Sequence, residues 1–368
     1  MVKAVETTLE IDLNALEHNY GHLKARLKPS TKFMAVVKAF AYGSDMAIIA
    51  KKLEALRVDY FAVAYVNEGV MLRNAGVKTP ILVLHPQSVN FDELIERCLE
   101  PSIYSLRVLK QFLTVAKQHG QSDYPVHLKF NTGLNRLGFW ERDVNFILQQ
   151  IHNRQEIKIK SIFSHLAASE DAAEKEFSLK QISLFEKVGA ELQEKLEYPF
   201  MKHMLNTSGI VNFSKAQYEM VRSGIGLYGY ANDAAIDGQL KPVATLKTII
   251  SQIHKIEPHE SVGYNRAFKA DGYKMTATLP IGHADGIGRQ YGMGKTSVLV
   301  NGQPALIIGN VCMDMMMVDV TGIDCKEGDE VIVFGGPLSA ETFAKTANTI
   351  SYEILTGISQ RVKRRVKK

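Results

Sequence analysis

Eight short apolar runs, rich in β-branched and aromatic residues, recur between residues 30 and 225, and longer amphipathic segments separate them. The separating segments, such as "DMAIIAKKLEALR" and "FDELIERCLE", repeat apolar residues at i, i+3 and i+4 and are therefore predicted helices. Strands that alternate with helices favour βαβ units and a parallel sheet. Eight such units close a barrel, so we expect an α/β fold of the (β/α)8 TIM type. The predicted strands are KFMAVVK, YFAVAYV, PILVLH, EPSIYS, PVHLKF, IKIKSIFSH, FMKHMLN and YEMVRSG.

After the eighth run the pattern changes, because strand candidates now follow one another without long helices between them. The pair Asn301-Gly302 lies between two apolar runs, which predicts a type I′ hairpin. We therefore expect a mainly antiparallel β domain after the barrel. The last segment, "SAETFAKTANTISYEILTGIS", indicates one or two helices attached to it. We assign residues 12–229 to the barrel, and residues 230–368 together with 1–11 to the β domain.

The composition is that of a soluble globular protein, with 46% hydrophobic and 23% charged residues. A chain of 368 residues is too long for one ordinary core, which agrees with a large barrel and a second domain. No apolar run approaches the roughly 20 residues that a membrane helix needs. The opening "MVKAVETTLEIDL" lacks the apolar core of a signal peptide. We therefore expect a cytoplasmic protein with no membrane partner.

Charge and cysteine content exclude two further classes. The net charge of +5 is mild, and the basic tail "RVKRRVKK" has no interleaved aromatic residues, so no nucleic-acid partner is expected. The three cysteines, Cys98, Cys312 and Cys325, are odd in number and widely spaced. They predict neither a disulfide framework nor a zinc site, and we expect no metal.

In a (β/α)8 barrel the functional face lies at the carboxyl ends of the strands. Each residue there has an ordinary explanation when taken alone: a strand-end lysine such as Lys38 is usually solvated, a single histidine such as His165 is usually structural, and "NTSG" usually forms a turn. Together they bring cations, hydroxyl groups and backbone N–H groups to one face, which favours a phosphate site. A strand-end lysine beside a phosphate indicates a Schiff base with pyridoxal 5′-phosphate. The candidates are Lys38, Leu84, Lys129, Arg136, His165, Asn206 to Gly209, Arg222 and Ser223 to Gly226.

The motif "AVVKAFAYG" resembles the A-V-V-K-A-N-A-Y-G lysine motif of the alanine racemase family. "HLKFNTGLNRLGF" is similar to the family's K-x-D-T-G-x-x-R-L-G segment, and "MVRSGIGLYG" to its barrel-closing segment. "EIDLNALEHNY" resembles the family's opening. "LKPVATLKTII", "LPIGHADGIGR", "GNVCMDMMMVDVT" and "NTISYEILTGIS" resemble its carboxyl-terminal domain. The resemblance covers nearly the whole chain in the right order.

This resemblance implies a homodimeric alanine racemase that uses pyridoxal 5′-phosphate to interconvert L-alanine and D-alanine and supplies D-alanine for peptidoglycan. Racemisation needs one base on each face of the substrate. By similarity, Lys38 forms the Schiff base and acts on one face, and Tyr264 of the partner subunit acts on the other. A phenol ordinarily titrates near about pH 10, so a catalytic tyrosine implies nearby cationic or hydrogen-bonding support.

The same resemblance implies the roles of other residues. Arg222 faces the pyridine nitrogen and disfavours its protonation, which suits proton return at Cα. Arg136 hydrogen-bonds the cofactor's phenolic oxygen, belongs to the substrate-binding set, and is held by Lys129, a candidate for carbamylation by CO2. His165 supports the ring. The remaining cofactor contacts are Tyr42, Leu84, Asn206, Thr207, Ser208, Gly224, Ile225 and Tyr352. The remaining substrate contacts are Met313 and Asp314.

Four positions depart from the family's common pattern. Phe40 stands for an asparagine, Asn131 for an aspartate, His283 for a tyrosine at the site entrance and Thr356 for a cysteine. Asn131 bears on the carbamylation of Lys129, and His283 bears on substrate access and pH dependence. None of the four removes a catalytic role.

Two alternatives stay open at this point. A broad-specificity or serine racemase would use the same site, and kcat/KM values over a panel of amino acids would identify it. A non-catalytic pyridoxal phosphate carrier would share the barrel, but such proteins generally lack a second domain. Decarboxylases of basic amino acids share the two-domain plan, but neither their cofactor-nitrogen carboxylate nor their carboxyl-terminal cysteine motif is apparent here.

Overall fold

The barrel forms as the strand pattern predicts. The computed structural model describes residues 4–231 and 234–367 of the chain. Eight parallel strands form a closed barrel, and β2 pairs with β9, with Lys32 opposite Met220, to complete the circle. All eight predicted strands are present, which confirms the (β/α)8 barrel. The strands are β2 Lys32–Val36, β3 Tyr60–Val63, β4 Ile81–Val83, β5 Glu100–Ile103, β6 Tyr124–Lys129, β7 Ile157–Phe163, β8 Met201–His203 and β9 Met220–Ser223.

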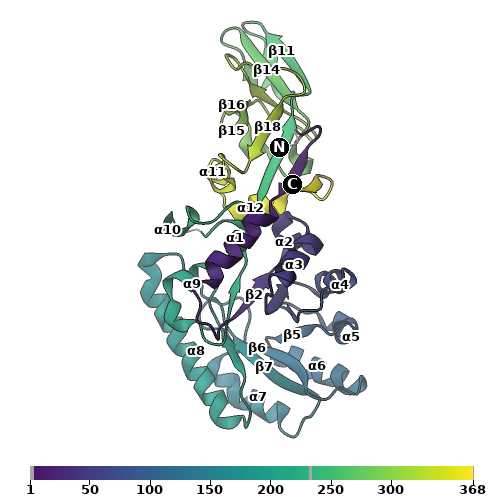
Figure 1. Cartoon of the computed structure of the whole chain (residues 1–368), viewed down its shortest axis with the longest axis vertical. Helices are drawn as coiled ribbons and strands as arrows, with labels where there is room; N and C mark the ends of the chain where they lie inside the picture. The colour runs from purple at the N-terminus through teal and green to yellow at the C-terminus, as the bar shows by residue number, and fades with distance from the viewer. Residues whose placement is uncertain (1–3, 232–233, 368) are drawn as a thin grey trace.

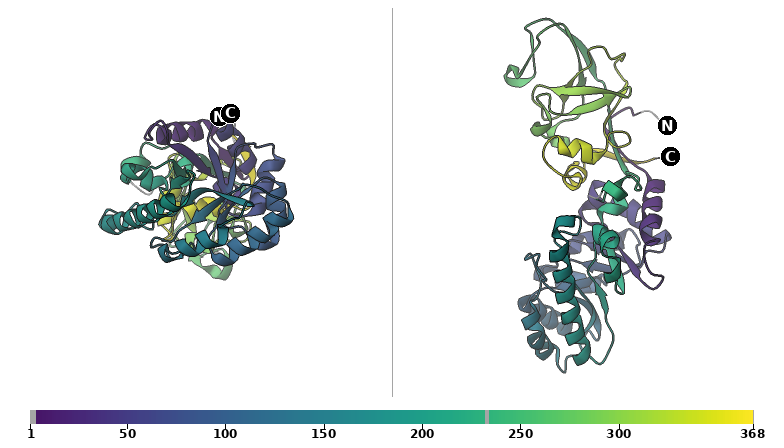
Figure 2. Two further views of the ribbon diagram at one scale, coloured as in Figure 1. Left: turned by 90° about the horizontal axis from the view of Figure 1, so that it is seen from below. Right: turned by 90° about the vertical axis from the view of Figure 1, so that its left-hand side faces the viewer.

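Amphipathic helices surround the barrel, as Figure 1 and the left view of Figure 2 show. In α6, Val108, Phe112 and Ala116 recur at i+4 spacing and are buried, because this stripe of the helix faces the barrel. The strands are covered on both faces, and all four residues of β3 are buried. The helices of the barrel are α1 Leu13–Lys24, α2 Lys38–Gly43, α3 Met46–Ala55, α4 Val66–Asn74, α5 Phe91–Glu96, α6 Leu106–Gln118, α7 Val144–Ile151, α8 Lys175–Lys195 and α9 Thr207–Asn212.

A mainly antiparallel sheet forms the second domain, as expected. Its nine strands follow the order β11-β14-β17-β16-β15-β18-β10-β1-β19. The predicted run "VATLKTIISQIHKI" divides into β10 and β11, which lie apart in the sheet. The strands are β1 Thr8–Ile11, β10 Ala244–Ile249, β11 Gln252–Ile256, β14 Lys274–Leu279, β15 Ser297–Val300, β16 Gln303–Ile308, β17 Met316–Asp319, β18 Glu330–Phe334 and β19 Lys363–Val366. The remaining elements are the paired strands β12 Ser261–Val262 and β13 Phe268–Lys269, and the helices α10 Ala234–Asp237, α11 Ala340–Lys345 and α12 Ser351–Gly357.

The sheet domain stands on the barrel end to end, as the right view of Figure 2 shows. Strand β1 runs antiparallel to β10 and parallel to β19, so both ends of the described chain belong to this sheet. Helix α12 packs against α2 at the junction. None of the helices in the described part of the chain combines the length and the apolar character of a membrane span.

We propose that the domains comprise residues 12–229 and residues 230–368 with 1–11. Of these ranges, residues 1–3, 232–233 and 368 lie outside the described residues.

The hairpin between β15 and β16 has the turn that its sequence predicts. Asn301 and Gly302 have φ values of 48° and 80°, and Val300 lies opposite Gln303. Positive φ at both central residues is the signature of a type I′ turn, which confirms the prediction.

Replacement of Gly302 by alanine is expected to lower the free energy of unfolding by about 1 kcal/mol, because a Cβ is strained at positive φ. Gly21 in α1 is the matched control, since an added Cβ meets nothing within 4 Å at either position. Gly21→Ala should raise the free energy of unfolding by about 0.5 to 1 kcal/mol. Urea denaturation of both variants tests the pair, and effects of the same sign would contradict the explanation.

Candidate active site

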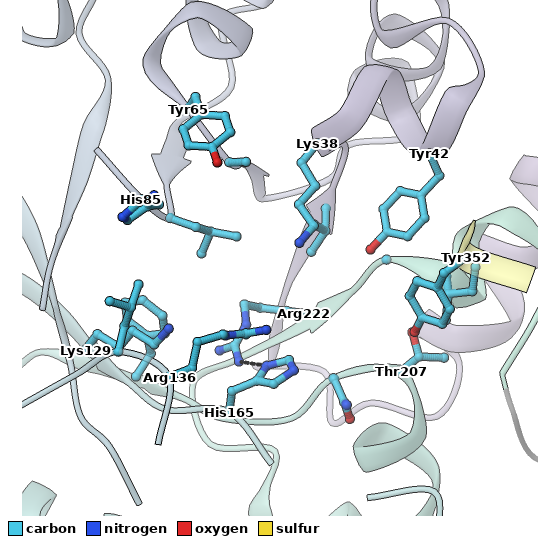
Figure 3. Close-up of a pocket in the computed structure, with 18 of the residues that line it drawn as sticks. Lys38, Tyr42, Tyr65, His85, Lys129, Arg136, His165, Thr207, Arg222 and Tyr352 are labelled. Atoms are coloured by element: carbon cyan, nitrogen blue, oxygen red, sulfur yellow. Dashed lines mark hydrogen bonds between the residues drawn. The ribbon is translucent and has the colours of Figure 1, made fainter. Parts of the chain in front are cut away.

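A cavity of about 710 Å³ opens at the carboxyl ends of the barrel strands. Figure 3 shows its side chains, which come from strand ends, from the segments that directly follow them, including the starts of α2 and α9, and from α12. The structure brings together most of the barrel residues that the sequence predicts for the site, and Tyr352 of α12 joins them, whereas Gly209, Ser223 and Gly226 do not line the cavity. The predicted residues that line it are Lys38, Tyr42, Leu84, Lys129, Arg136, His165, Asn206, Thr207, Ser208, Arg222, Gly224, Ile225 and Tyr352.

A left-handed turn places Lys38 and Tyr42 in this cavity. Ala39, Phe40, Ala41 and Tyr42 all have φ between 53° and 54°, so α2 winds in the left-handed sense. Such a conformation costs roughly 1 to 2 kcal/mol for each residue with a Cβ, so surrounding contacts must stabilise it.

The carboxylate of Glu68 supplies part of that stabilisation. It accepts the backbone N–H of Ala39 at 2.6 Å and, through its other oxygen, the N–H of Ala64 at 2.6 Å. Gly43 ends the turn where an added Cβ would lie 1.9 Å from the carbonyl oxygen of Leu355 in α12. The conformation that delivers Lys38 therefore depends on residues that are distant in sequence.

Four cations converge on the cavity: Lys38, Lys129, Arg136 and Arg222. Burial and the neighbouring Arg136 lower the pKa of the Lys38 amine, and Glu68 partly offsets that effect. Burial, Arg136, Arg222 and Lys38 lower the pKa of Lys129 to about 8. In the described part of the chain, no carboxylate lies within ion-pairing distance of these four groups. The cavity is therefore suited to an anionic ligand.

Arg222 is held rigidly beneath the cavity. Its Nη1 donates to Nδ1 of His203 at 2.6 Å, and its Nη2 donates to the carbonyl oxygen of Ser164 at 2.6 Å. Nδ1 of His165 lies 3.2 Å from Nη2, shown by a dashed line in Figure 3. Burial and Arg222 keep the pKa of His165 well below its usual range, so this imidazole is neutral.

The other end of the cavity is lined by phenols and close-packed backbone. An added Cβ at Gly224 would lie 2.1 Å from the hydroxyl oxygen of Tyr42, so only glycine lets the backbone approach this closely. The Tyr42 ring stacks on Tyr228 with centroids 4.5 Å apart. Burial raises the pKa of Tyr352 to about 12, so its phenol is protonated and can donate a hydrogen bond.

The predicted hydroxyl contacts at this end already have partners within the protein. Thr207 Oγ1 bonds Ser223 Oγ at 2.9 Å and accepts the N–H of Gly226 at 3.2 Å. Ser208 Oγ donates to the carbonyl oxygen of Ala231 at 3.0 Å. Asn206 Oδ1 accepts the N–H of Gly209, so "NTSG" starts α9 rather than forming an isolated turn.

Three predicted residues lie elsewhere, on the sheet domain. Tyr264, Met313 and Asp314 line an open hollow of about 500 Å³ together with Met315 and Met317. The exposed fractions are 73% for Tyr264 and 60% for Met313, and neither residue lines the barrel cavity.

Arg361 fixes the third of these residues. It donates to Asp314 at 2.7 Å and also binds Asp285 at 2.7 Å. Asp314 is therefore held by a cation on the same domain.

Some residues of the site were not predicted from the sequence. Tyr65, His85 and Phe163 also line the cavity, and Glu68 supports it from behind. The sequence did carry a signal for Glu68, because an acidic residue in the first turn of a helix often accepts hydrogen bonds from the backbone N–H groups there. Asn131, one of the four positions that depart from the family's common pattern, accepts the backbone N–H of Asn135 through its side-chain oxygen and so shapes a local turn.

These features fit pyridoxal 5′-phosphate. The cavity offers an amine with a lowered pKa, an excess of positive charge and a glycine-lined cradle at one end. A phosphate is stabilised by cations, phenols and backbone N–H groups, and an aldehyde reacts with a neutral amine. The described residues contain no cluster of three or more potential metal ligands.

Comparisons with known proteins point to one family. The family model "Alanine racemase, N-terminal domain" matches residues 11–232, and "Alanine racemase, C-terminal domain" matches residues 243–366. The alanine racemase of Clostridium novyi is 36% identical over 96% of this chain and 94% of that protein. The solved alanine racemase of Clostridium difficile 630 has a TM-score of 0.93 and 34% identity, covering 99% of this chain and 96% of that chain.

A third relative, from Bartonella henselae, is described as an alanine racemase with covalently bound pyridoxal phosphate. It has a TM-score of 0.90 and 29% identity, covering 99% of this chain and 100% of that chain. Because family models match both domains and relatives above 30% identity span nearly the whole chain, the protein belongs to the alanine racemase family of pyridoxal phosphate-dependent isomerases.

Proposed function

We propose that this protein racemises alanine by a two-base mechanism and supplies D-alanine for peptidoglycan. Lys38 of one subunit acts on one face of the substrate, and Tyr264 of the partner subunit acts on the other. The observation that carries this proposal is the separation of the two predicted bases. Lys38 lies in the barrel cavity, whereas Tyr264 is 73% exposed on the sheet domain of the same chain.

A homodimer would bring the two halves together. Met313, Met315 and Tyr264 leave large apolar surface exposed around one hollow, and such a surface is typical of an interface. A second copy of the chain that covers the barrel cavity would supply Tyr264, the Met313 backbone and Asp314 to it. A homodimer with a two-fold axis would then have two equivalent active sites.

When bound, pyridoxal 5′-phosphate supplies an electron-withdrawing ring that acidifies the α-hydrogen of an amino acid. Lys38 would hold the aldehyde carbon of this group, and Arg222 would lie toward its ring nitrogen. The lowered pKa of Lys38 favours the neutral amine, which is the form that attacks a carbonyl and accepts a proton. Phosphate contacts come from Tyr42, Tyr352, Thr207, Ser208, Gly224 and Ile225. The ring contacts are Leu84, Arg136, His165 and Asn206.

Arg222 also controls the outcome of the reaction. A guanidinium has only N–H donors and carries a positive charge, so it disfavours a proton on the facing ring nitrogen. Electron withdrawal is then weaker than it would be opposite a carboxylate. Rapid return of the proton to Cα is favoured over transfer to another carbon.

Incubation with L-alanine in D2O should yield D-alanine that carries deuterium at Cα. The Tyr264→Phe variant should lose racemisation by about 100-fold or more, because one face has no base. It should still exchange the α-hydrogen of the enantiomer that presents it to Lys38. NMR of both enantiomers measures the exchange.

Tyr273→Phe is the matched control, because Tyr273 is also an exposed tyrosine of the sheet domain but lies outside the hollow. A wild-type protein that binds the cofactor and exchanges neither enantiomer would refute the proposed function. Equal loss of exchange for both enantiomers in Tyr264→Phe would refute the two-base assignment.

A mixture of two inactive variants should regain activity. In a mixed dimer of Lys38→Ala and Tyr264→Phe subunits, one site carries both substitutions and the other carries neither. Random exchange of equal amounts should therefore restore about a quarter of wild-type activity. Racemisation assays after subunit exchange, with each variant alone as the control, measure this. Absence of recovery despite demonstrated mixed dimers would show that each site lies within one chain.

Lys129 should carry a carbamate in the presence of CO2. Carbamylation requires the neutral amine, and with a pKa of about 8 that form predominates above pH 8 and declines below it. The resulting anion would lie among Lys38, Arg136 and Arg222, none of which forms an ion pair with a carboxylate of the described residues. Carbon-13 NMR with labelled bicarbonate should show a signal that Lys129→Ala removes. Lys160→Ala, on the exposed face of β7, should keep it; loss in both variants would contradict the assignment.

A further inference from the structure

A chain of polar side chains crosses the barrel interior below the cavity. Glu100, His127, Ser161, His203 and Arg222 come from five successive strands, β5 to β9, one residue from each. The strands β5 to β9 are neighbours in the barrel. Four of these residues take no part in the mechanism proposed above, although side chains of this kind are rarely buried without a partner.

Each link of this series is a hydrogen bond, and three of the four are 2.6 Å long. The carboxylate of Glu100 lies 2.6 Å from Nε2 of His127, and Nδ1 of His127 lies 2.6 Å from Ser161 Oγ. Ser161 Oγ lies 2.9 Å from Nε2 of His203. Nδ1 of His203 lies 2.6 Å from Nη1 of Arg222.

The two ends fix the direction of every bond. Arg222 can only donate, so Nδ1 of His203 accepts and its Nε2 carries the hydrogen. Ser161 accepts that hydrogen and donates its own to Nδ1 of His127. Nε2 of His127 then donates to Glu100, which as a carboxylate can only accept. His203 is thereby held in one defined tautomer, with a bare Nδ1 toward Arg222.

These groups are shielded from water, so their partners come from the protein alone; Arg222 also donates to the carbonyl oxygens of His203, Ser164 and Met204. The exposed fractions of His127, Ser161 and His203 are all 0%, and that of Arg222 is 4%. Burial and Arg222 keep the pKa of His203 well below its usual range, in agreement with a neutral ring. The Glu100 side chain is 12% exposed, so its charge is only partly screened by water.

We propose that Glu100 is a positioning residue for Arg222, and that it acts through His127, Ser161 and His203. The carboxylate holds His203 in the tautomer whose bare Nδ1 faces the guanidinium. The opposite tautomer would set one N–H against another and displace Arg222. This inference rests on the proposed function for one point, namely that Arg222 faces the ring nitrogen of the cofactor.

The Ser161→Ala substitution interrupts this series of hydrogen-bonded side chains in its middle by removing one oxygen atom. Ser102→Ala is the matched control, because Ser102 lies on β5, two strands from Ser161 in the barrel, is equally buried, and has a hydroxyl without a hydrogen-bond partner among the described residues. Ser161→Ala should lower kcat about tenfold with KM for alanine changed less than about twofold, because Arg222 loses its fixed position. Ser102→Ala should change neither constant.

A second readout does not depend on catalysis. Full-length protein with nitrogen-15 histidine, with and without the cofactor, should show slowly exchanging Nε2–H signals from His127 and His203. These signals are assigned by their loss in His127→Asn and His203→Asn. Ser161→Ala should lose the His203 signal, and Ser102→Ala should keep both.

The outcomes separate the two proposals. Retention of both histidine signals in Ser161→Ala would refute the hydrogen-bonded series from Glu100 to Arg222. Loss of the His203 signal with an unchanged kcat would refute the positioning role of Glu100. If Ser161→Ala does not fold, Glu100→Gln answers the question, because glutamine keeps an acceptor oxygen for His127 but removes the charge. A fall in kcat of about threefold at constant KM supports the role, and an unchanged kcat refutes it.

Failure of the wild-type protein to racemise alanine would refute the proposed function alone, since the histidine signals are measured without turnover.

Discussion

The concentration of positive charge at the mouth of the barrel is the constraint on which the rest of the site depends. Lys38, Lys129, Arg136 and Arg222 lie around one cavity, and like charges at such distances in a poorly solvated space repel each other. Burial, together with this repulsion, lowers the pKa of both lysines. A lysine that must attack a carbonyl and later accept a proton is more effective when it is neutral. The same positive charge therefore favours the neutral form of Lys38 and attracts an anionic cofactor.

A rigid frame is needed to hold these charges together, and the barrel supplies it through contacts between distant segments. The left-handed turn after Lys38 is unfavourable in isolation. Glu68 from α4 binds its backbone, and Arg364 from β19 donates to the carbonyl of Gly43 at 2.8 Å. Tyr352 from α12 reaches the same cavity. The sheet domain thus completes the site of its own barrel as well as the one proposed for its partner.

The sequence is sufficient to predict the barrel, because each strand is an apolar run bounded by polar residues and each helix has a 3.6-residue period. It also predicts which residues converge, since the carboxyl ends of parallel strands meet on one face. It does not predict the left-handed turn, because Ala39, Phe40 and Ala41 have no preference for positive φ and are held there only by tertiary contacts. Nor does it show that Thr207 and Ser208 are already hydrogen-bonded within the protein, since those partners depend on three-dimensional packing.

The buried polar chain escaped prediction for a related reason. In "PVHLKF" His127 reads as one polar residue in an apolar strand, and Glu100 reads as a strand end. That these residues belong to one hydrogen-bonded series becomes visible only when β5 to β9 lie side by side in the barrel. The chain also resolves a difficulty in the cationic site, because a buried guanidinium without a carboxylate partner is costly. Direct contact with a carboxylate would neutralise Arg222 and weaken its effect on the ring nitrogen. In the proposed arrangement, Glu100 lies behind two imidazoles and a hydroxyl, stabilises that charge and orients the guanidinium, while the face of Arg222 toward the cavity stays cationic.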